Sequence, residues 1–155
     1  MDPKQKRVLK KIVMVAIFTT VMAVSLMTLK DYINKSEAMR AMDLVSREAL
    51  AYRKSYGSLP SESNITKFLD RIQAVRLGNF NYRAMWIEYG SNADTTILAY
   101  SKKNYKWPLR PGYITLWLNG KTQWLTAEQF EPILQNQQNK IEMDVLQQQL
   151  KQHRR

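Results

Sequence analysis

The longest apolar run in the chain, Ile12–Leu29, lies near the N-terminal end and reads IVMVAIFTTVMAVSLMTL. None of its eighteen side chains is charged, and its polar members are only Thr and Ser. A membrane-crossing helix needs about 20 apolar residues, whereas the apolar part of a signal peptide usually has about 7–15. The run therefore predicts a retained transmembrane helix. A signal peptide cleaved near Ala38 or Ala41 is the alternative.

The helical pattern continues beyond this run, because no Pro or Gly occurs between Leu29 and Tyr56. Small and apolar residues recur there at spacings of mostly three to five, which is typical of one helix face. These positions are Ile33, Ala38, Ala41, Met42, Val45, Ala49, Tyr52 and Tyr56. Gly57 and Pro60 are stop signals. We predict one helix over residues 8–56, about 73 Å long, half in lipid and half presenting an apolar stripe.

After Gly57 the pattern of apolar positions changes. Residues 61–75 predict a short second helix that Ser61 or Asn64 can cap. Alternating, aromatic-rich segments between turn signals then predict four strands. They are Tyr82–Tyr89, Thr95–Ser101, Tyr113–Leu118 and Lys121–Leu125. A small antiparallel sheet must bury one face, and the amphipathic half of the long helix is the available partner. The sequence thus predicts an α+β fold.

The C-terminal part of the chain begins with a helix signal and then becomes rich in Gln. Thr126 and Gln129 form a capping box, so a helix should start there, adjusted at Pro132. Beyond it, residues 135–155 are a helical or disordered tail. The predicted organisation is a basic N-terminus (1–11), a transmembrane helix (12–29), an α+β domain (30–134) and this tail (135–155).

The last two strands form a hairpin, GYITLWLNGKTQWL, with its turn at Asn119 and Gly120. A two-residue turn pairs Leu118 with Lys121, Leu116 with Gln123 and Ile114 with Leu125. Ile114, Leu116 and Leu118 would then face the long helix, near Val45, Ala49 and Tyr52. Tyr113, Trp117 and Trp124 would point away from it. We expect Phe130 and Leu134 to cover this second face, and the alternative is an open partner surface of Tyr113, Trp117 and Trp124.

The distribution of charge predicts how the transmembrane helix is oriented in the membrane. The formal net charge is +11, and residues 1–11 hold five Lys or Arg against one Asp. A dense positive cluster before a transmembrane helix favours a cytoplasmic N-terminus, so the domain should lie outside the cytoplasm. The chain has no Cys and a single His, His153. These counts exclude disulfides and thiolate metal sites and argue against a His-based site.

The sequence has no motif that indicates catalysis or cofactor binding. No phosphate-binding loop, nucleophile elbow or metal-ligand spacing occurs, and the carboxylates fall mostly on predicted helices, so we expect neither an enzyme nor a cofactor. The loop SKKNYKWPLRPG carries Lys102, Lys103, Lys106 and Arg110 and no acid, which argues against calcium. With Tyr105 and Trp107, this loop could bind nucleic acid. The favoured reading is a surface loop held by its own aromatic side chains.

Two segments resemble the type IV pilin and pseudopilin superfamily. Residues 47–62, REALAYRKSYGSLPSE, are similar to the end of the pseudopilin spine helix, and residues 97–134 to the C-terminal strands and short helix. The order of elements agrees as well. The resemblance implies a long spine helix packed by a small antiparallel sheet. Prepilins of this superfamily carry a Gly before the apolar start, where the peptidase cuts, and a Glu near the start of the mature chain. Here there is no such Gly, Lys10 and Lys11 stand in place of the cleavage signature, and the apolar run has no Glu.

Together these features predict a single-pass, pilin-like structural or interaction protein of the inner (cytoplasmic) membrane. It would be a pseudopilin-like component of a secretion or pilus-type assembly, and the alternative is an accessory subunit of another membrane complex. Its expected partners are membrane lipid and other membrane or pilin-like proteins, including copies of itself. A surface nucleic-acid-binding protein is the weakest of the three hypotheses, and we do not expect nucleic acid to be a partner.

Overall fold

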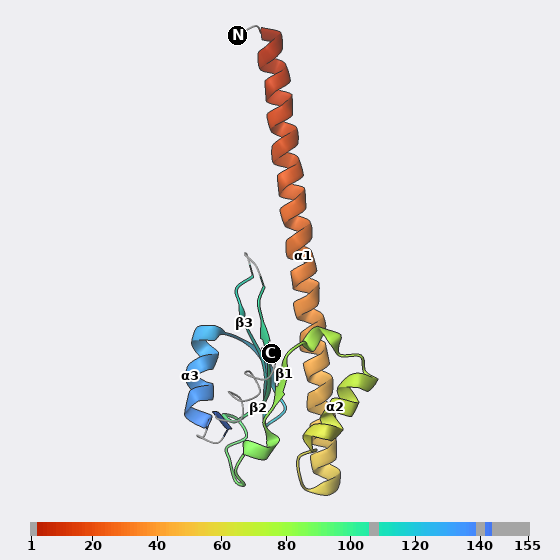
Figure 1. Cartoon of the computed structure of the whole chain (residues 1–155), viewed down its shortest axis with the longest axis vertical. Coiled ribbons are helices and arrows are strands. Elements are labelled where there is room, and N and C mark those ends of the chain that lie inside the picture. Colours follow the sequence, from red (N-terminus) through yellow and green to blue (C-terminus); the bar gives the residue numbers. More distant parts are fainter. Residues whose placement is uncertain (1–2, 106–108, 139–141, 144–155) are drawn as a thin grey trace, which may run out of the picture.

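The computed structural model describes residues 3–105, 109–138 and 142–143. It is an α+β fold in which one long helix stands out and all other elements gather around its C-terminal half (Figure 1). The helices are α1 (Pro3–Tyr56), α2 (Glu62–Arg71) and α3 (Ala127–Gln137), with short 3-10 turns η1 (Val75–Leu77) and η2 (Ala84–Trp86). The strands are β1 (Phe80–Tyr82), β2 (Ile97–Lys103), β3 (Gly112–Trp117) and β4 (Thr122–Thr126), paired antiparallel in the order β1-β2-β3-β4.

The N-terminal half of α1 makes no packing contact that would bury its apolar side chains. Phe18, for example, is 68% exposed. The helix is long and apolar enough to cross a membrane. Its 54 residues extend about 81 Å at 1.5 Å per residue. The hydroxyl groups in the apolar run donate to backbone carbonyls four residues earlier, at Thr19, Thr20, Ser25 and Thr28. These bonds satisfy the only polar side chains that lipid would otherwise meet.

The C-terminal half of α1 packs on one face of the sheet, as the sequence predicts. Ala38, Met42, Val45 and Ala49 are fully buried, at the three-and-four spacing of one helix face. They form a core with Ile114, Leu116 and Leu118, whose predicted orientation toward the helix is confirmed. Ile65 of α2 and Leu77 of η1 close the same core from the side.

The register of the β3–β4 hairpin is shifted by one residue from the register that a two-residue turn predicts. Leu116 pairs with Thr122 and Ile114 with Trp124. The loop has three residues, because the N–H of Gly120 donates to the Trp117 carbonyl and the N–H of Trp117 donates to the Lys121 carbonyl, both at 2.9 Å. Gly120 has φ +90°, which is the left-handed residue that such a loop requires.

This shift moves Trp124 to the opposite face from the predicted one. Residues directly paired across two antiparallel strands point to the same side of the sheet. Trp124 therefore lies with Ile114 against α1, while Leu125 lies with Tyr113 on the other face. The prediction was correct for Trp117, which points away from α1, and wrong for Trp124.

The predicted first strand, Tyr82–Tyr89, is also wrong. β1 ends at Tyr82, and the backbone of Arg83 (φ −113°, ψ 9°) turns the chain into η2. The N–H of Arg83 donates to the Leu98 carbonyl at 2.8 Å, which is the last hydrogen bond between this segment and β2. The Arg83 side chain is buried in the interior. β2 begins and ends two residues later than predicted. Helix α2 is capped by Ser61, as predicted, but it ends at Arg71, four residues early.

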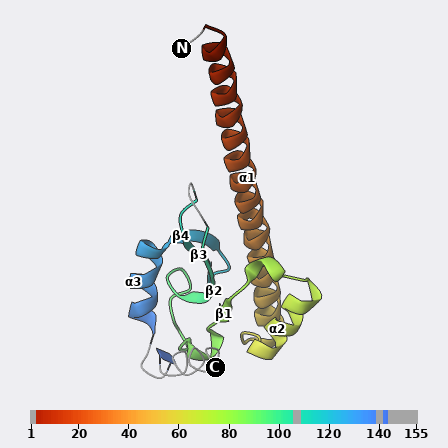
Figure 2. The same ribbon diagram turned by 45° about the horizontal axis from the view of Figure 1, so that its top comes forward.

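Helix α3 covers the second face of the sheet, so that α1 and α3 lie on opposite sides of it (Figures 1 and 2). The capping box is formed, and the N–H of Thr126 donates to Gln129 Oε1 at 3.1 Å. The helix runs through Pro132 to Gln137. Phe130 is fully buried, with Leu134 packed beside it, so the expected covering of this face is confirmed.

Candidate interaction surfaces

The aromatic face of the sheet on the α3 side is a buried core. The ring of Phe130 stacks on Tyr113 with centroids 4.0 Å apart and lies 5.0 Å from Tyr100. Tyr113 is 7% exposed and Trp117 is 8% exposed. The alternative of an open partner surface is therefore wrong for these two side chains, because α3 occupies the space. Trp124 is partly buried on the other face.

The hairpin turn is docked on α1. Ser46 Oγ donates to the Gly120 carbonyl at 2.6 Å, and a Cβ at Gly120 would collide with the Leu50 side chain. Asn119 Nδ2 donates to Asp94 Oδ1 at 2.9 Å, and the N–H of Asn119 donates to the Ala93 carbonyl. Both turn residues thus serve packing within the domain. The hairpin lies along α1 with its turn near Ser46.

The opposite end of the hairpin lies nearer the apolar half of α1. There the Nζ of Lys35 sits 4.1 Å from the ring centroid of Trp124. The Tyr105 ring stacks on the same indole at 5.8 Å. Gly112 leaves the room for this stack, since a Cβ at that position would lie 2.6 Å from the Trp124 ring. Burial lowers the pKa of Lys35 and raises the pKa of the Tyr105 hydroxyl.

The predicted basic residues of the β2–β3 connection have different surroundings. Lys103 Nζ donates to the carbonyls of Arg76 and Leu77 at 2.5 and 2.6 Å, and burial lowers its pKa. Lys102 is exposed, with its Nζ 5.7 Å from the Tyr113 ring centroid, and Arg110 is exposed. Lys106 lies outside the described residues. Lys103 therefore links β2 to η1, while Lys102 and Arg110 face solvent.

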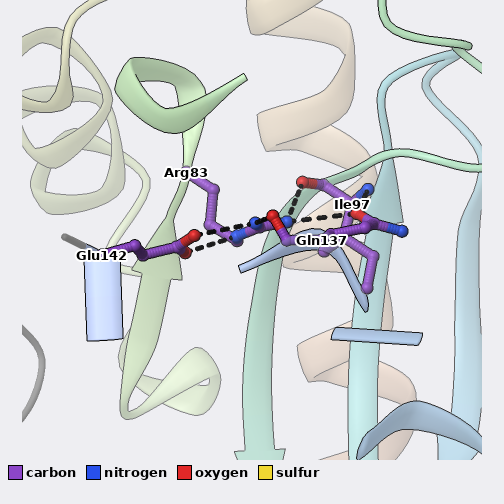
Figure 3. A network of polar contacts seen from close by, with 4 residues as sticks. All are labelled: Arg83, Ile97, Gln137 and Glu142. Atoms are coloured by element: carbon purple, nitrogen blue, oxygen red, sulfur yellow. Dashed lines mark hydrogen bonds and ion pairs between the residues drawn. The ribbon is translucent and has the colours of Figure 1, made fainter. Parts of the chain in front are cut away.

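A buried polar network joins the sheet to the segment after α3 (Figure 3). Arg83 is 3% exposed, and its Nε and Nη2 donate to the two carboxylate oxygens of Glu142 at 2.6 and 3.0 Å. Arg83 also donates to the Ile97 carbonyl and to the side-chain and backbone oxygens of Gln137. The Gln137 amide accepts from the Ile97 N–H and donates to the Thr95 carbonyl. This network fastens the end of α3 to β2 and η2.

A separate cleft lies at the end of α1 farthest from the apolar run. It has a volume of about 690 Å³ and both apolar and charged walls. Its lining includes Arg53, Leu59, Tyr82, Met85, Glu88 and Tyr89. The Tyr82 hydroxyl donates to the Pro60 carbonyl at 3.0 Å, and burial raises its pKa. Among the described residues, no group of three His, Cys, Asp or Glu side chains could hold a metal ion.

Sequence reasoning missed the polar network entirely. Arg83 stands in an aromatic-rich segment that was interpreted as a strand, and Glu142 stands in a Gln-rich tail. No local signal marks either residue, because 59 positions separate them.

No family model, curated protein sequence or solved structure matches the chain. Its likeness to pilins is therefore one of general shape, a long N-terminal helix packed against a small antiparallel sheet.

Proposed function

We propose that this chain is a single-pass membrane-anchored protein whose α+β domain has a structural or interaction role. The observation that carries the proposal is the continuity of α1. One helix combines an exposed apolar half with a half that forms the domain core. A helix that leaves the membrane without a break holds its domain at a fixed height above the bilayer. Such rigidity suits a subunit that presents a surface to membrane neighbours.

The charge pattern supports an orientation for this anchor. Five Lys or Arg lie in residues 1–11, while the positive charges after Leu29 are interleaved with acids. By the positive-inside rule, the N-terminus lies in the cytoplasm and the domain on the far side of the inner membrane.

The most specific role that we propose is that of a pseudopilin-like component of a secretion or pilus-type assembly. The general shape and the two resembling segments, 47–62 and 97–134, support it. The alternative is an accessory subunit of another membrane complex. It is favoured by the Lys10-Lys11 pair in place of a cleavage Gly and by the missing Glu in the apolar run.

Cysteine labelling tests the anchor and its orientation, because the chain has no native Cys. Gln5→Cys marks the N-terminal end, and Tyr89→Cys marks a fully exposed position of the domain. In bacterial cells with a permeabilised outer envelope and an intact inner membrane, an impermeant maleimide should label Tyr89→Cys at once. Gln5→Cys should react only after detergent is added. The reverse pattern would refute the orientation, and labelling of a soluble, released chain would refute the anchor.

Affinity purification from the native membrane separates the two roles. A pseudopilin-like component should bring down other pilin-like chains in variable amounts. An accessory subunit should bring down one complex of fixed stoichiometry. Recovery of the chain by itself under mild detergent would count against both.

A further inference from the structure

The sheet extends to the position on α1 where the apolar run ends. Leu29 is the last residue of that run, and Lys30 is the first charge. Partial burial of α1 begins at Thr28 and continues at Asp31 and Lys35, on the face that leads to the buried Ala38. The domain therefore begins within one turn of the end of the apolar segment, without a spacer.

Helix geometry converts these positions into heights above the hydrocarbon. At 1.5 Å per residue, Asp31 and Lys35 lie about 3 Å and 9 Å beyond Leu29 along the helix axis. The headgroup layer on each side of a bilayer is about 5–8 Å thick. Tyr105 and Trp124, which stack beside Lys35, thus lie at the outer edge of the headgroups when residues 12–29 span the membrane.

The parts of the β2–β3 connection that the structure describes make up this end of the sheet. Figures 1 and 2 both show this connection on the side of the sheet nearest the N-terminal half of α1. Lys103 ties it to η1 through two carbonyl bonds, and η1 is tied to α1 by the ion pair of Arg76 with Glu37 at 3.0 Å. The C-terminal end of β2 is consequently fixed to η1, which packs on α1 through the buried Leu77.

The chemistry of this end is basic and aromatic. We define the membrane-side surface by Lys30 and Lys35 of α1 and by Lys102, Tyr105 and Arg110 at the loop end of β2 and β3. Its four cations are opposed by Asp31 and by Glu128 and Glu131 of α3, since Glu37 is paired with Arg76. Tyr belongs to the residue types enriched at membrane interfaces. Each Lys or Arg near an anionic bilayer contributes about fivefold to association, or about 1 kcal/mol.

We propose that the membrane-side surface docks on the anionic headgroups of the same bilayer in which α1 is anchored. This inference rests on the proposed membrane anchor and goes beyond it, because it assigns the end of the domain a lipid partner. Position favours lipid over a protein or nucleic-acid partner. Lys30 and Asp31 stand at headgroup height and Lys35 just outside it, so anionic headgroups are the nearest partner that this surface meets.

Site-directed spin labelling of the full chain in vesicles tests the proposal. A nitroxide is attached at Asn104→Cys, an exposed position beside Tyr105, or at Tyr89→Cys as the distant control. The vesicles contain phosphatidylcholine with roughly one-third phosphatidylglycerol, or phosphatidylcholine alone, and a trace of nickel-chelating lipid. At low salt, relaxation by nickel lipid at position 104 should be several-fold stronger in anionic vesicles than in phosphatidylcholine alone, and position 89 should show no such difference. Equal relaxation of position 104 in the two kinds of vesicle would overturn the proposal.

Charge removal supplies the second arm. Lys102→Gln with Arg110→Gln removes two exposed cations from the surface, and Lys54→Gln with Lys67→Gln removes two from the far end of the domain. The first pair should lower the docked-to-undocked ratio about 25-fold, at about fivefold for each charge, and bring relaxation at position 104 toward its value in neutral vesicles, with Lys30 and Lys35 still in place. The control pair should change it less than twofold. Contact that is the same in neutral and anionic vesicles, or that survives the first pair, would refute recognition of anionic lipid.

Alkaline carbonate extraction of the same vesicles keeps the two proposals apart. Protein that resists extraction while position 104 stays remote from nickel lipid refutes the docking surface alone. Protein that is extracted refutes the membrane anchor, and the docking surface fails with it.

Discussion

The buried ion pair of Arg83 and Glu142 gives the most demanding prediction about stability. Arg83→Met keeps the length and apolar stem of the side chain but removes the guanidinium. The Glu142 carboxylate, in a residue that is 1% exposed, then loses both of its charge-assisted bonds to Arg83. The carbonyls of Ile97 and Gln137 lose their guanidinium donor as well.

The expected cost follows from this burial. Breaking a buried ion pair by removing one partner typically costs about 3–5 kcal/mol, because the remaining charge stays desolvated after its counter-charge is gone. Replacing both partners by apolar side chains of similar volume is often close to neutral. Arg83→Met should therefore lower the free energy of unfolding by about 3–5 kcal/mol. Arg83→Met combined with Glu142→Met should recover most of that loss.

Arg76→Met is the matched control, since it makes the same substitution at an exposed pair. The side chains of Arg76 and Glu37 are 56% and 48% exposed, so the loss there should be at most about 1 kcal/mol. The assay is urea unfolding of the full chain in mild detergent, followed by tryptophan fluorescence. A loss below about 1 kcal/mol for Arg83→Met, equal to that of Arg76→Met, would show that the network does not hold the C-terminal segment.

Three further predictions concern the two sides of the sheet. Gly112→Ala places a Cβ 2.5 Å from the Leu125 backbone carbonyl oxygen and 2.6 Å from the Trp124 ring, so it should cost about 1–3 kcal/mol in urea unfolding, whereas an unchanged midpoint would contradict this close approach of β3 and β4. Phe130→Ala should cost about 3–5 kcal/mol and shift the fluorescence of Trp117 to the red, and unchanged emission would contradict the docking of α3. Burial raises the pKa of Tyr82 above its unfolded value near 10, so the folded state holds this proton more tightly. The stability that this proton contributes is complete below the unfolded pKa and falls as pH rises above it. The free energy of unfolding of Tyr82→Phe should therefore fall less than that of the wild type at alkaline pH, and equal falls would contradict the burial of this hydroxyl.

Local patterns predicted the elements that depend on local chemistry. The helix period of residues 38–49, the Ser61 cap and the Thr126 capping box all appear where the sequence places them. The alternation of Ile114, Leu116 and Leu118 was enough to orient β3 on α1. Each of these features is decided by residues within a few positions of one another.

The remaining features depend on contacts between distant segments. Asn119-Gly120 fits both a two-residue and a three-residue loop, and the docking of Gly120 on Ser46, 74 positions away, accompanies the longer one. That single choice moved Trp124 to the other face. The predicted first strand ends at Tyr82, and the Arg83 side chain pairs with Glu142, 59 positions later, which no local periodicity indicates. The candidate surfaces were predicted least well for the same reason.

The central claim is that residues 12–29 stay attached as the membrane anchor of the domain. N-terminal sequencing of the mature protein, extracted from native membranes, tests it most directly. The account predicts a mature chain that still contains the whole of residues 12–29. A mature N-terminus after Ala38 or Ala41 would contradict it, because the apolar run would then be a cleaved signal and the domain would be released.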